Sequence, residues 1–107
     1  MKIWLDDIRP APEGYTWCKS VNEAKAKIVD SEKWRMSGLK NLHGFEITVI
    51  DCDHDLGDFA KDGGDGIELL NWLEISMREY PIHLHTMNPV GRERMRSVIR
   101  KNGWKEI

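Results

Sequence analysis

The sequence predicts an α/β fold built on a mainly parallel sheet of about four strands. Short apolar runs alternate with segments that have helical spacing and helix-capping residues, which is typical of a parallel sheet with helices between its strands. Ile47, Val49 and Ile50 also depart from the simple alternation of a half-exposed strand, as expected of a strand buried on both faces. The chain of 107 residues is predicted to form one domain, residues 1–107.

Two strands and one helix are expected in the first part of the chain. Lys2–Leu5 and Tyr15–Lys19 are apolar or aromatic, and a loop rich in proline and glycine separates them. Ser20-Val21-Asn22-Glu23 is a capping box, in which the serine hydroxyl accepts from the glutamate amide and the glutamate reaches back. A helix should therefore start here and run to about Asp30 or beyond. The helical pattern dissolves over residues 31–44, which are expected to form a surface connection.

The second part of the chain is expected to alternate strand, helix, strand and helix. Phe45–Cys52 is predicted to be a central strand, and Ile82–Thr86 a shorter one. A helix should run from a D-x-x-E cap at Asp65 to about Glu79. The last helix should start at Asn88-Pro89 and end at Asn102-Gly103. The residues expected to face the core from these two helices are Ile67, Leu70, Leu73, Met77, Met95, Val98 and Ile99, and Trp4 and Trp72 are also expected to be buried.

Composition and charge are those of an ordinary globular protein. The chain is 40% hydrophobic and 32% charged, and 16 basic against 18 acidic residues give a net charge of -2. This balance argues neither for nor against nucleic acid, and no extended nucleic-acid surface is evident. Residues 51–65 hold six Asp and one Lys, whereas residues 92–101 hold five basic residues and one Glu. This separation of an acidic and a basic stretch suits a bound cation with an anionic ligand above it, although each of the two stretches could be a solvated face.

The two cysteines, Cys18 and Cys52, are not spaced as a zinc pair, and a secreted disulfide scaffold would normally carry more. Reduced thiols, and hence a cytoplasmic protein, are therefore expected. No apolar stretch approaches the ~20 residues that a membrane span needs. The N-terminus also lacks the apolar run of a signal peptide.

Polar clusters follow three of the predicted strands: Asp6-Asp7, the stretch around Asp53, and His85-Thr86-Met87-Asn88. Ligands of parallel sheets bind beyond the carboxyl ends of the strands, so these clusters are expected to converge on one site. Three carboxylates there would supply the oxygen ligands that Mg²⁺ or Mn²⁺ takes alongside water and substrate phosphate. The alternative is that Asp is favoured after strands because it makes turns.

His54 and His85 lie at two of these strand ends. Imidazole suits acid and base work near neutral pH, and two such groups could take a proton from water and give one to a leaving oxygen. Each histidine could equally be satisfied by a neighbouring Asp. Asp55 is expected to assist, either by supporting these groups from behind or as a metal partner. His83 lies two residues further from the strand end and is expected to be packed.

The start of the last helix has the features of a phosphate site. Asn88-Pro89-Val90-Gly91-Arg92 combines amides at a helix N-terminus, a glycine that permits close approach, and an Arg. Ordinary capping explains Asn88 and Pro89 without a ligand, but it does not call for Gly91.

Four blocks of the sequence together resemble the signature of the cyclic-phosphate processing receiver-like domain family, a divergent relative of response-regulator receiver domains. The resemblance covers nearly the whole chain. It implies a truncated receiver-like (flavodoxin-like) three-layer fold and the processing of phosphate or cyclic phosphate groups on RNA ends or nucleotides. The blocks are Leu5-Asp6-Asp7-Ile8-Arg9-Pro10, Asp53-His54-Asp55-Leu56-Gly57, Asp65-Gly66 and His85-Thr86-Met87-Asn88-Pro89-Val90-Gly91-Arg92.

Receiver domains hold Mg²⁺ with an acidic pair after the first strand and an Asp after the third, and they carry Thr or Ser after the fourth. Asp6-Asp7, Asp53 and Thr86 are similar by position. The match then fails, because only Trp104–Ile107 follows the last helix and leaves no room for a fifth strand with its Lys and a fifth helix. Residues 9–14 also replace the usual first helix, which would open space above Asp6-Asp7.

The leading prediction is a Mg²⁺- or Mn²⁺-dependent phosphoesterase that acts on a cyclic phosphate of a nucleotide or an RNA end. One alternative is a binding module that sequesters a nucleotide messenger without turnover. Another is a receiver-like phospho-acceptor, or a purely protein-binding domain. The predicted site consists of metal ligands Asp6, Asp7 and Asp53, acid–base residues His54, His85 and Asp55, and phosphate-binding residues Arg9, Thr86, Asn88, Gly91 and Arg92.

Overall fold

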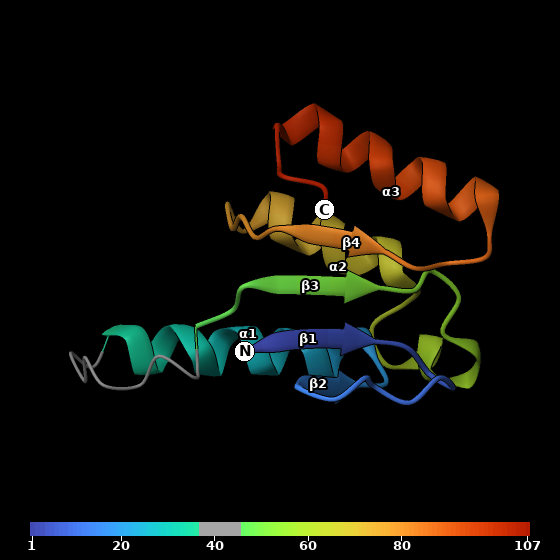
Figure 1. Ribbon diagram of the computed structural model, residues 1–107. Coiled ribbons are helices and arrows are strands. Elements are labelled where there is room, and N and C mark those ends of the chain that lie inside the picture. The colour runs from blue at the N-terminus through green and yellow to red at the C-terminus, as the bar shows by residue number, and fades with distance from the viewer. Residues whose placement is uncertain (37–45) are drawn as a thin grey trace.

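A computed structural model describes residues 1–36 and 46–107 and shows an α/β fold with a four-stranded parallel sheet in the order β2-β1-β3-β4 (Figure 1). The predicted fold class is therefore confirmed. The strands are β1 (Lys2–Leu5), β2 (Tyr15–Cys18), β3 (Val49–Cys52) and β4 (Ile82–Leu84), and the helices are α1 (Val21–Met36), the 3-10 helix η2 (Gly57–Lys61), α2 (Gly66–Ile75) and α3 (Pro89–Asn102).

The two faces of the sheet have different surroundings. One face is apolar and fully buried, with Ile3, Leu5 and Ile50 among its members, and α1 and α2 lie against it (Figure 1). The register places Trp4 and Trp17 on the opposite face, where both are only half-buried. No described helix covers that face over β1 to β3, so the third layer of the predicted truncated three-layer fold is missing there.

Burial of Trp4 is therefore incomplete, and the same is true of Trp72, although both tryptophans were predicted to be core residues. Trp104, by contrast, is buried at the edge of the core. The residues that follow Trp104 run beside β4. There the amide of Ile82 donates to the Lys105 carbonyl, and the Ile107 amide donates to the Ile82 carbonyl. The residues after α3 thus make an isolated bridge with the sheet, between Ile82 and Glu106.

Helix α1 extends to Met36, so residues 31–36 are helical and the predicted surface connection was wrong for them. Residues 37–45, including the predicted strand start at Phe45, lie outside the described residues. The Ser20 hydroxyl accepts from the Glu23 amide as predicted, at 3.1 Å. The Glu23 carboxylate reaches back one residue further than expected and accepts from the Lys19 amide at 2.8 Å.

Helix α2 ends at Ile75 rather than near Glu79. The Ser76 hydroxyl donates to the Trp72 carbonyl at 2.6 Å, and Met77 adopts a positive φ of 58° that no helix can continue. Met77 is 93% exposed, so its predicted inward position was wrong. At the other end, Asp65 is the N-cap residue but its side chain makes no capping bond, because it accepts instead from the Leu56 amide.

Helix α3 follows the prediction closely. The Asn88 side chain accepts from the amides of Val90 and Gly91, and Gly103 ends the helix with a left-handed φ of 67°. Met95 and Ile99 are buried, and Val98 packs against the core.

Strands β3 and β4 are shorter than predicted. β3 begins at Val49, with Ile47 and Thr48 outside it, and β4 ends at Leu84 instead of Thr86. Backbone bonds continue past the ends, since the His85 amide donates to the Cys52 carbonyl. Beyond these points the chain leaves the ladder and its side chains turn toward the end of the sheet.

Both cysteines, Cys18 and Cys52, are free and buried. Burial raises the pKa of the Cys18 thiol to about 11, and it raises that of Cys52 as well. Across residues 1–36 and 46–107, none of the helices has the length and apolar character that a membrane crossing requires.

Candidate functional site

An open cleft of about 490 Å³ lies at the carboxyl ends of the strands. It brings together the three polar clusters that follow β1, β3 and β4, as the sequence predicted. The residues that line it are Asp6, Asp7, Ile8, Arg9, Asp53, Asp55, Gly57, Thr86, Met87 and Asn88.

Asp6 is a buried carboxylate held by backbone amides. Its Oδ1 accepts from the amides of Ile8 at 2.9 Å and Arg9 at 2.8 Å, and its Oδ2 lies 3.0 Å from His85 Nε2. Burial alone would raise the pKa of Asp6, but these two amides and the imidazole outweigh it and hold the pKa below its ordinary value. Asp6 is therefore anionic at neutral pH.

Asp53 lies next to Asp6, but its pKa is shifted in the opposite direction. Its Oδ1 accepts from the His54 amide at 2.8 Å. Burial raises the pKa of Asp53, the negative charge of Asp6 raises it further, and the His54 amide and the Thr86 hydroxyl offset only part of this. Two carboxylates packed in this way gain from a cation between them.

Asp7 reaches the cleft beside Gly57. A Cβ on Gly57 would lie 2.7 Å from Asp7 Oδ2, and Gly57 has a positive φ of 53°. The positive φ favours glycine here because a side chain would strain the turn, and a side chain would also push the end of the Asp7 carboxylate aside.

His85 lies behind the cleft between two carboxylates. Its Nδ1 is 2.6 Å from Asp51 Oδ1 and its Nε2 is 3.0 Å from Asp6 Oδ2, and its ring stacks on Trp4 at a centroid distance of 3.9 Å. Burial lowers the pKa of His85, but the bonds to Asp51 and Asp6 outweigh that effect and raise it. As an imidazolium, His85 donates from both nitrogens and compensates the charge of the two carboxylates.

His83 shares the same acceptor as His85, since its Nδ1 lies 2.9 Å from Asp51 Oδ1. Its side chain is 45% exposed, so its predicted packed position was wrong. Asp51 was not predicted as a site residue. Its position inside β3 gave no sequence signal of a contact with residues more than thirty positions away.

His54 is buried beside the cleft and is close to its wall at Asp55. Its Nδ1 lies 2.9 Å from Asp55 Oδ1, and its Nε2 has no hydrogen-bond partner among the described residues. The His54 contact lowers the pKa of Asp55, and a bond from Asn88 also lowers it. Asp55 itself is exposed on the cleft, where its carboxylate is oriented by both neighbours.

Two glycines permit the close packing around His54. A Cβ on Gly91 would lie 2.4 Å from His54 Cγ, and one on Gly66 would lie 2.0 Å from the Asp53 carbonyl oxygen. The signature glycines in Asp65-Gly66 and Val90-Gly91 thus allow α2 and α3 to approach the strand end. Gly91 does not line the cleft, and its amide donates to Asn88 Oδ1.

The other predicted phosphate-binding residues divide into two groups. Arg9, Thr86 and Asn88 line the cleft. Arg92 does not, because its guanidinium donates to the Thr86 carbonyl and so braces the turn before α3. The amides that begin α3 are capped by Asn88, so the phosphate-binding roles of Gly91 and Arg92 remain predictions.

The donor atoms of the cleft fit a hard divalent cation. One atom each from Asp6, Asp53 and His85 lie within 4.8 Å of one another. Both nitrogens of His85 already face carboxylates, so the donors left for a cation are carboxylate oxygens, with Asp7 on the same cleft. Oxygen ligands of this kind suit Mg²⁺ or Mn²⁺ rather than a soft metal.

A second group of donors, His54, Asp55 and Asp65, also lies within 4.8 Å. Asp65 was predicted only as a helix cap. Its Oδ1 already accepts from the Leu56 amide, and His54 Nδ1 is engaged by Asp55.

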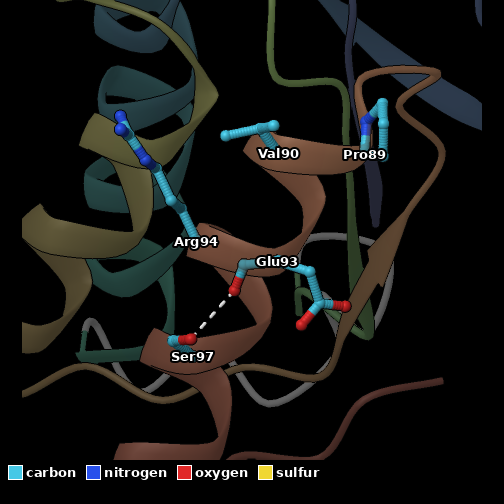
Figure 2. A pocket seen from close by; sticks show the side chains of 5 residues that line it. All are labelled: Pro89, Val90, Glu93, Arg94 and Ser97. Atoms are coloured by element: carbon cyan, nitrogen blue, oxygen red, sulfur yellow. Dashed lines mark hydrogen bonds between the residues drawn. The ribbon is translucent and has the colours of Figure 1, made fainter.

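A separate hollow of about 430 Å³ lies on the surface of α3 (Figure 2). It is lined by Pro89, Val90, Glu93, Arg94 and Ser97, and the Ser97 hydroxyl donates to the Glu93 carbonyl at 2.9 Å. None of the residues predicted to act in the site belongs to it. The acidic cleft is therefore the candidate site.

Comparison with known families agrees with this geometry. The family model described as the cyclic-phosphate processing receiver domain matches residues 1–101, which include every residue that lines the cleft. Searches of curated proteins and of solved structures gave no significant match. Because the match spans the sheet, all the helices described above and the acidic strand ends, the chain belongs to the cyclic-phosphate processing receiver domain family.

Proposed function

We propose that the protein is a Mg²⁺- or Mn²⁺-dependent phosphoesterase that opens a cyclic phosphate on a nucleotide or an RNA end. The observation that carries the proposal is the convergence of Asp6 and Asp53, from two neighbouring strands, on an open cleft that also contains Arg9, Thr86 and Asn88. Acidic and phosphate-binding groups at one strand edge are what a metal-assisted reaction of a phosphate diester requires.

Asp6, Asp7 and Asp53 would hold the cation. When bound, it would neutralise phosphate charge and make water more acidic. Arg9, whose Nε lies 3.8 Å from Asp6 Oδ2, and the side-chain amide of Asn88 would bind the phosphate oxygens. The exposed apolar side chains of Ile8 and Met87 also line the cleft, and they suit an organic group attached to the phosphate.

The reaction needs a proton acceptor for water and a proton donor for the leaving oxygen. Water adds to phosphorus, the bond from phosphorus to one ribose oxygen breaks, and that oxygen takes a proton. Asp55 is exposed on the cleft and is oriented by His54, so this pair is positioned to accept the proton from water and return it. His85 would keep Asp6 anionic and fixed, because both of its nitrogens are engaged.

The burial of both histidines favours a second function, the binding of a nucleotide messenger without turnover. The side chains of His54 and His85 are both buried, and neither histidine lines the cleft. A module that binds a nucleotide messenger and does not turn it over would need only the cleft wall.

A phospho-acceptor role for Asp53 predicts instead that acetyl phosphate labels the protein and that Asp53→Asn abolishes the label.

The test is turnover by purified protein with Mg²⁺ or Mn²⁺ across 2′,3′-cyclic nucleotides, 3′,5′-cyclic nucleotides and RNA ends. We expect conversion of at least one cyclic phosphate, loss of conversion in EDTA, and loss in Asp53→Asn. Ligand that binds tightly and is recovered intact would favour the sequestering module. Absence of both binding and turnover across the whole series would contradict the proposal.

A further inference from the structure

The uncovered face of the sheet carries aromatic rings next to the cleft. Trp4, Tyr15 and Trp17 lie on this face, because Trp4 pairs in register with Trp17 and its ring meets Tyr15 edge to face at 5.9 Å. All three residues are half-buried, and no described helix covers them. Solvent therefore reaches an aromatic surface that a covering helix would otherwise bury.

Basic side chains accompany these rings. Lys2 Nζ lies 5.4 Å from the centre of the Tyr15 ring, and Lys19 Nζ lies 4.7 Å from that of Trp17. Neither lysine forms an ion pair with any residue in the described parts of the chain. Asp51, which also lies on this face, is buried and hydrogen-bonded by two histidines. The surface thus combines aromatic rings with two lysines that stand over them.

A hollow of about 420 Å³ opens on the same face. It is lined by Lys2, Tyr15, Thr48, Val49, Asp51, His83 and Ile107. Strand β1 joins this hollow to the cleft, since Lys2 lies in the hollow and Asp6 in the cleft. Lys2 and Asp6 are four residue steps apart, about 13 Å along the strand. This is more than one nucleotide step, so it suits a base further along a single strand better than the base attached to the reacting phosphate.

We infer that this face is a stacking platform for unpaired bases, and that the ligand of the cleft is the end of a single RNA strand rather than a free mononucleotide. The inference rests on the proposed function for the placement of the terminal phosphate. Exposed aromatic rings beside basic side chains recognise single strands because every base has a flat face to stack and every phosphate a charge to neutralise.

The test uses a fluorescein-labelled RNA pentanucleotide with a 3′-hydroxyl, so that the strand end carries no cyclic phosphate to react. Fluorescence anisotropy in EDTA should show binding that weakens as salt rises. Tyr15→Ala should weaken binding by roughly 5- to 140-fold, the effect of losing one stacked base, whereas Tyr15→Phe keeps the ring and should bind like the wild type. Lys2→Glu should weaken binding as well, and Lys33→Glu, on the exposed surface of α1, is the charge-matched control.

The outcomes separate this inference from the proposed function, which is tested by turnover of a 2′,3′-cyclic mononucleotide on the wild type. Turnover of the mononucleotide without binding of the pentanucleotide overturns the platform and leaves the phosphoesterase standing. Equal binding by Tyr15→Ala and Tyr15→Phe, or equal loss in Lys2→Glu and Lys33→Glu, also overturns it. Binding that depends on Tyr15, with no turnover of any cyclic phosphate, supports the platform and contradicts the phosphoesterase.

Discussion

Replacing Asp53 by Asn should make the metal-free protein more stable while it removes the response to a divalent cation. Burial and the neighbouring charge of Asp6 raise the pKa of Asp53, so its anionic form is disfavoured in the folded state. Asparagine has the same shape, and its oxygen can still accept from the His54 amide that now bonds to Asp53 at 2.8 Å. The substitution therefore removes a charge without removing this contact.

The size of the effect follows from the geometry. Ligand atoms of Asp6 and Asp53 lie within 4.8 Å of each other, and two unit charges at that distance repel by about 3 kcal/mol at an effective dielectric constant of ~20. The imidazolium of His85 offsets part of this, since it attracts the same carboxylate. We expect Asp53→Asn to raise the free energy of unfolding by ~1–2 kcal/mol, which is a rise in Tm of about 4 °C or more for a domain of this size.

Thermal unfolding in EDTA and in Mn²⁺ is the assay. Wild-type protein should gain stability in Mn²⁺, by about 2.7 kcal/mol at a hundred times the Kd, and Asp53→Asn should not. Asp58→Asn, an exposed change in η2, is the control and should respond to Mn²⁺ like the wild type. A lower Tm for Asp53→Asn in EDTA, or an undiminished shift with Mn²⁺, would refute the reasoning.

Three further predictions concern the residues that support the cleft. Gly91→Ala should cost about 1–3 kcal/mol in urea unfolding, because its Cβ would lie 2.4 Å from His54 Cγ; an unchanged midpoint would count against this packing. Asn88→Ala should cost about 1 kcal/mol by loss of the helix cap, with Asn88→Ser, which keeps a capping oxygen, nearly neutral as its control. The pKa of His85 is raised in the folded protein, partly by its contact with Asp51. The protein therefore has the full stabilisation from this contact below the unfolded pKa of His85, about 6.5, and loses it as pH rises through the folded pKa. The stability difference between wild type and His85→Gln should therefore shrink between pH 6 and pH 9, and a constant difference would argue against the imidazolium.

Local sequence signals predicted the elements whose ends are set by their own side chains. Asn88 and Gly103 cap α3 as expected, and the Ser20 hydroxyl begins α1. The same reasoning failed at Met77, where helical spacing continued in the sequence after the backbone had already left the helix. A pattern of spacing records which face a residue would occupy, but not where the hydrogen-bonded turn ends.

The convergence of the strand ends was predictable because parallel strands present their carboxyl ends at one edge. The roles within the site were less accessible to prediction. Asp51 and His85 are 34 positions apart, and their 2.6 Å contact depends on the strand order. The glycine at position 91 was expected to permit the close approach of phosphate, and the structure adds that it makes room for the His54 ring.

The central claim is that the acidic cleft opens a cyclic phosphate with the help of a divalent cation. Phosphorus NMR of a 2′,3′-cyclic nucleotide mixed with the protein and Mg²⁺ tests it most directly, because the cyclic diester and the product monoester have separate resonances. The account predicts that the diester signal is replaced by a monoester signal, and that EDTA or Asp53→Asn prevents the change. A diester signal that persists unchanged with folded protein in the presence of Mg²⁺, for this nucleotide and for an RNA strand ending in the same group, would contradict it.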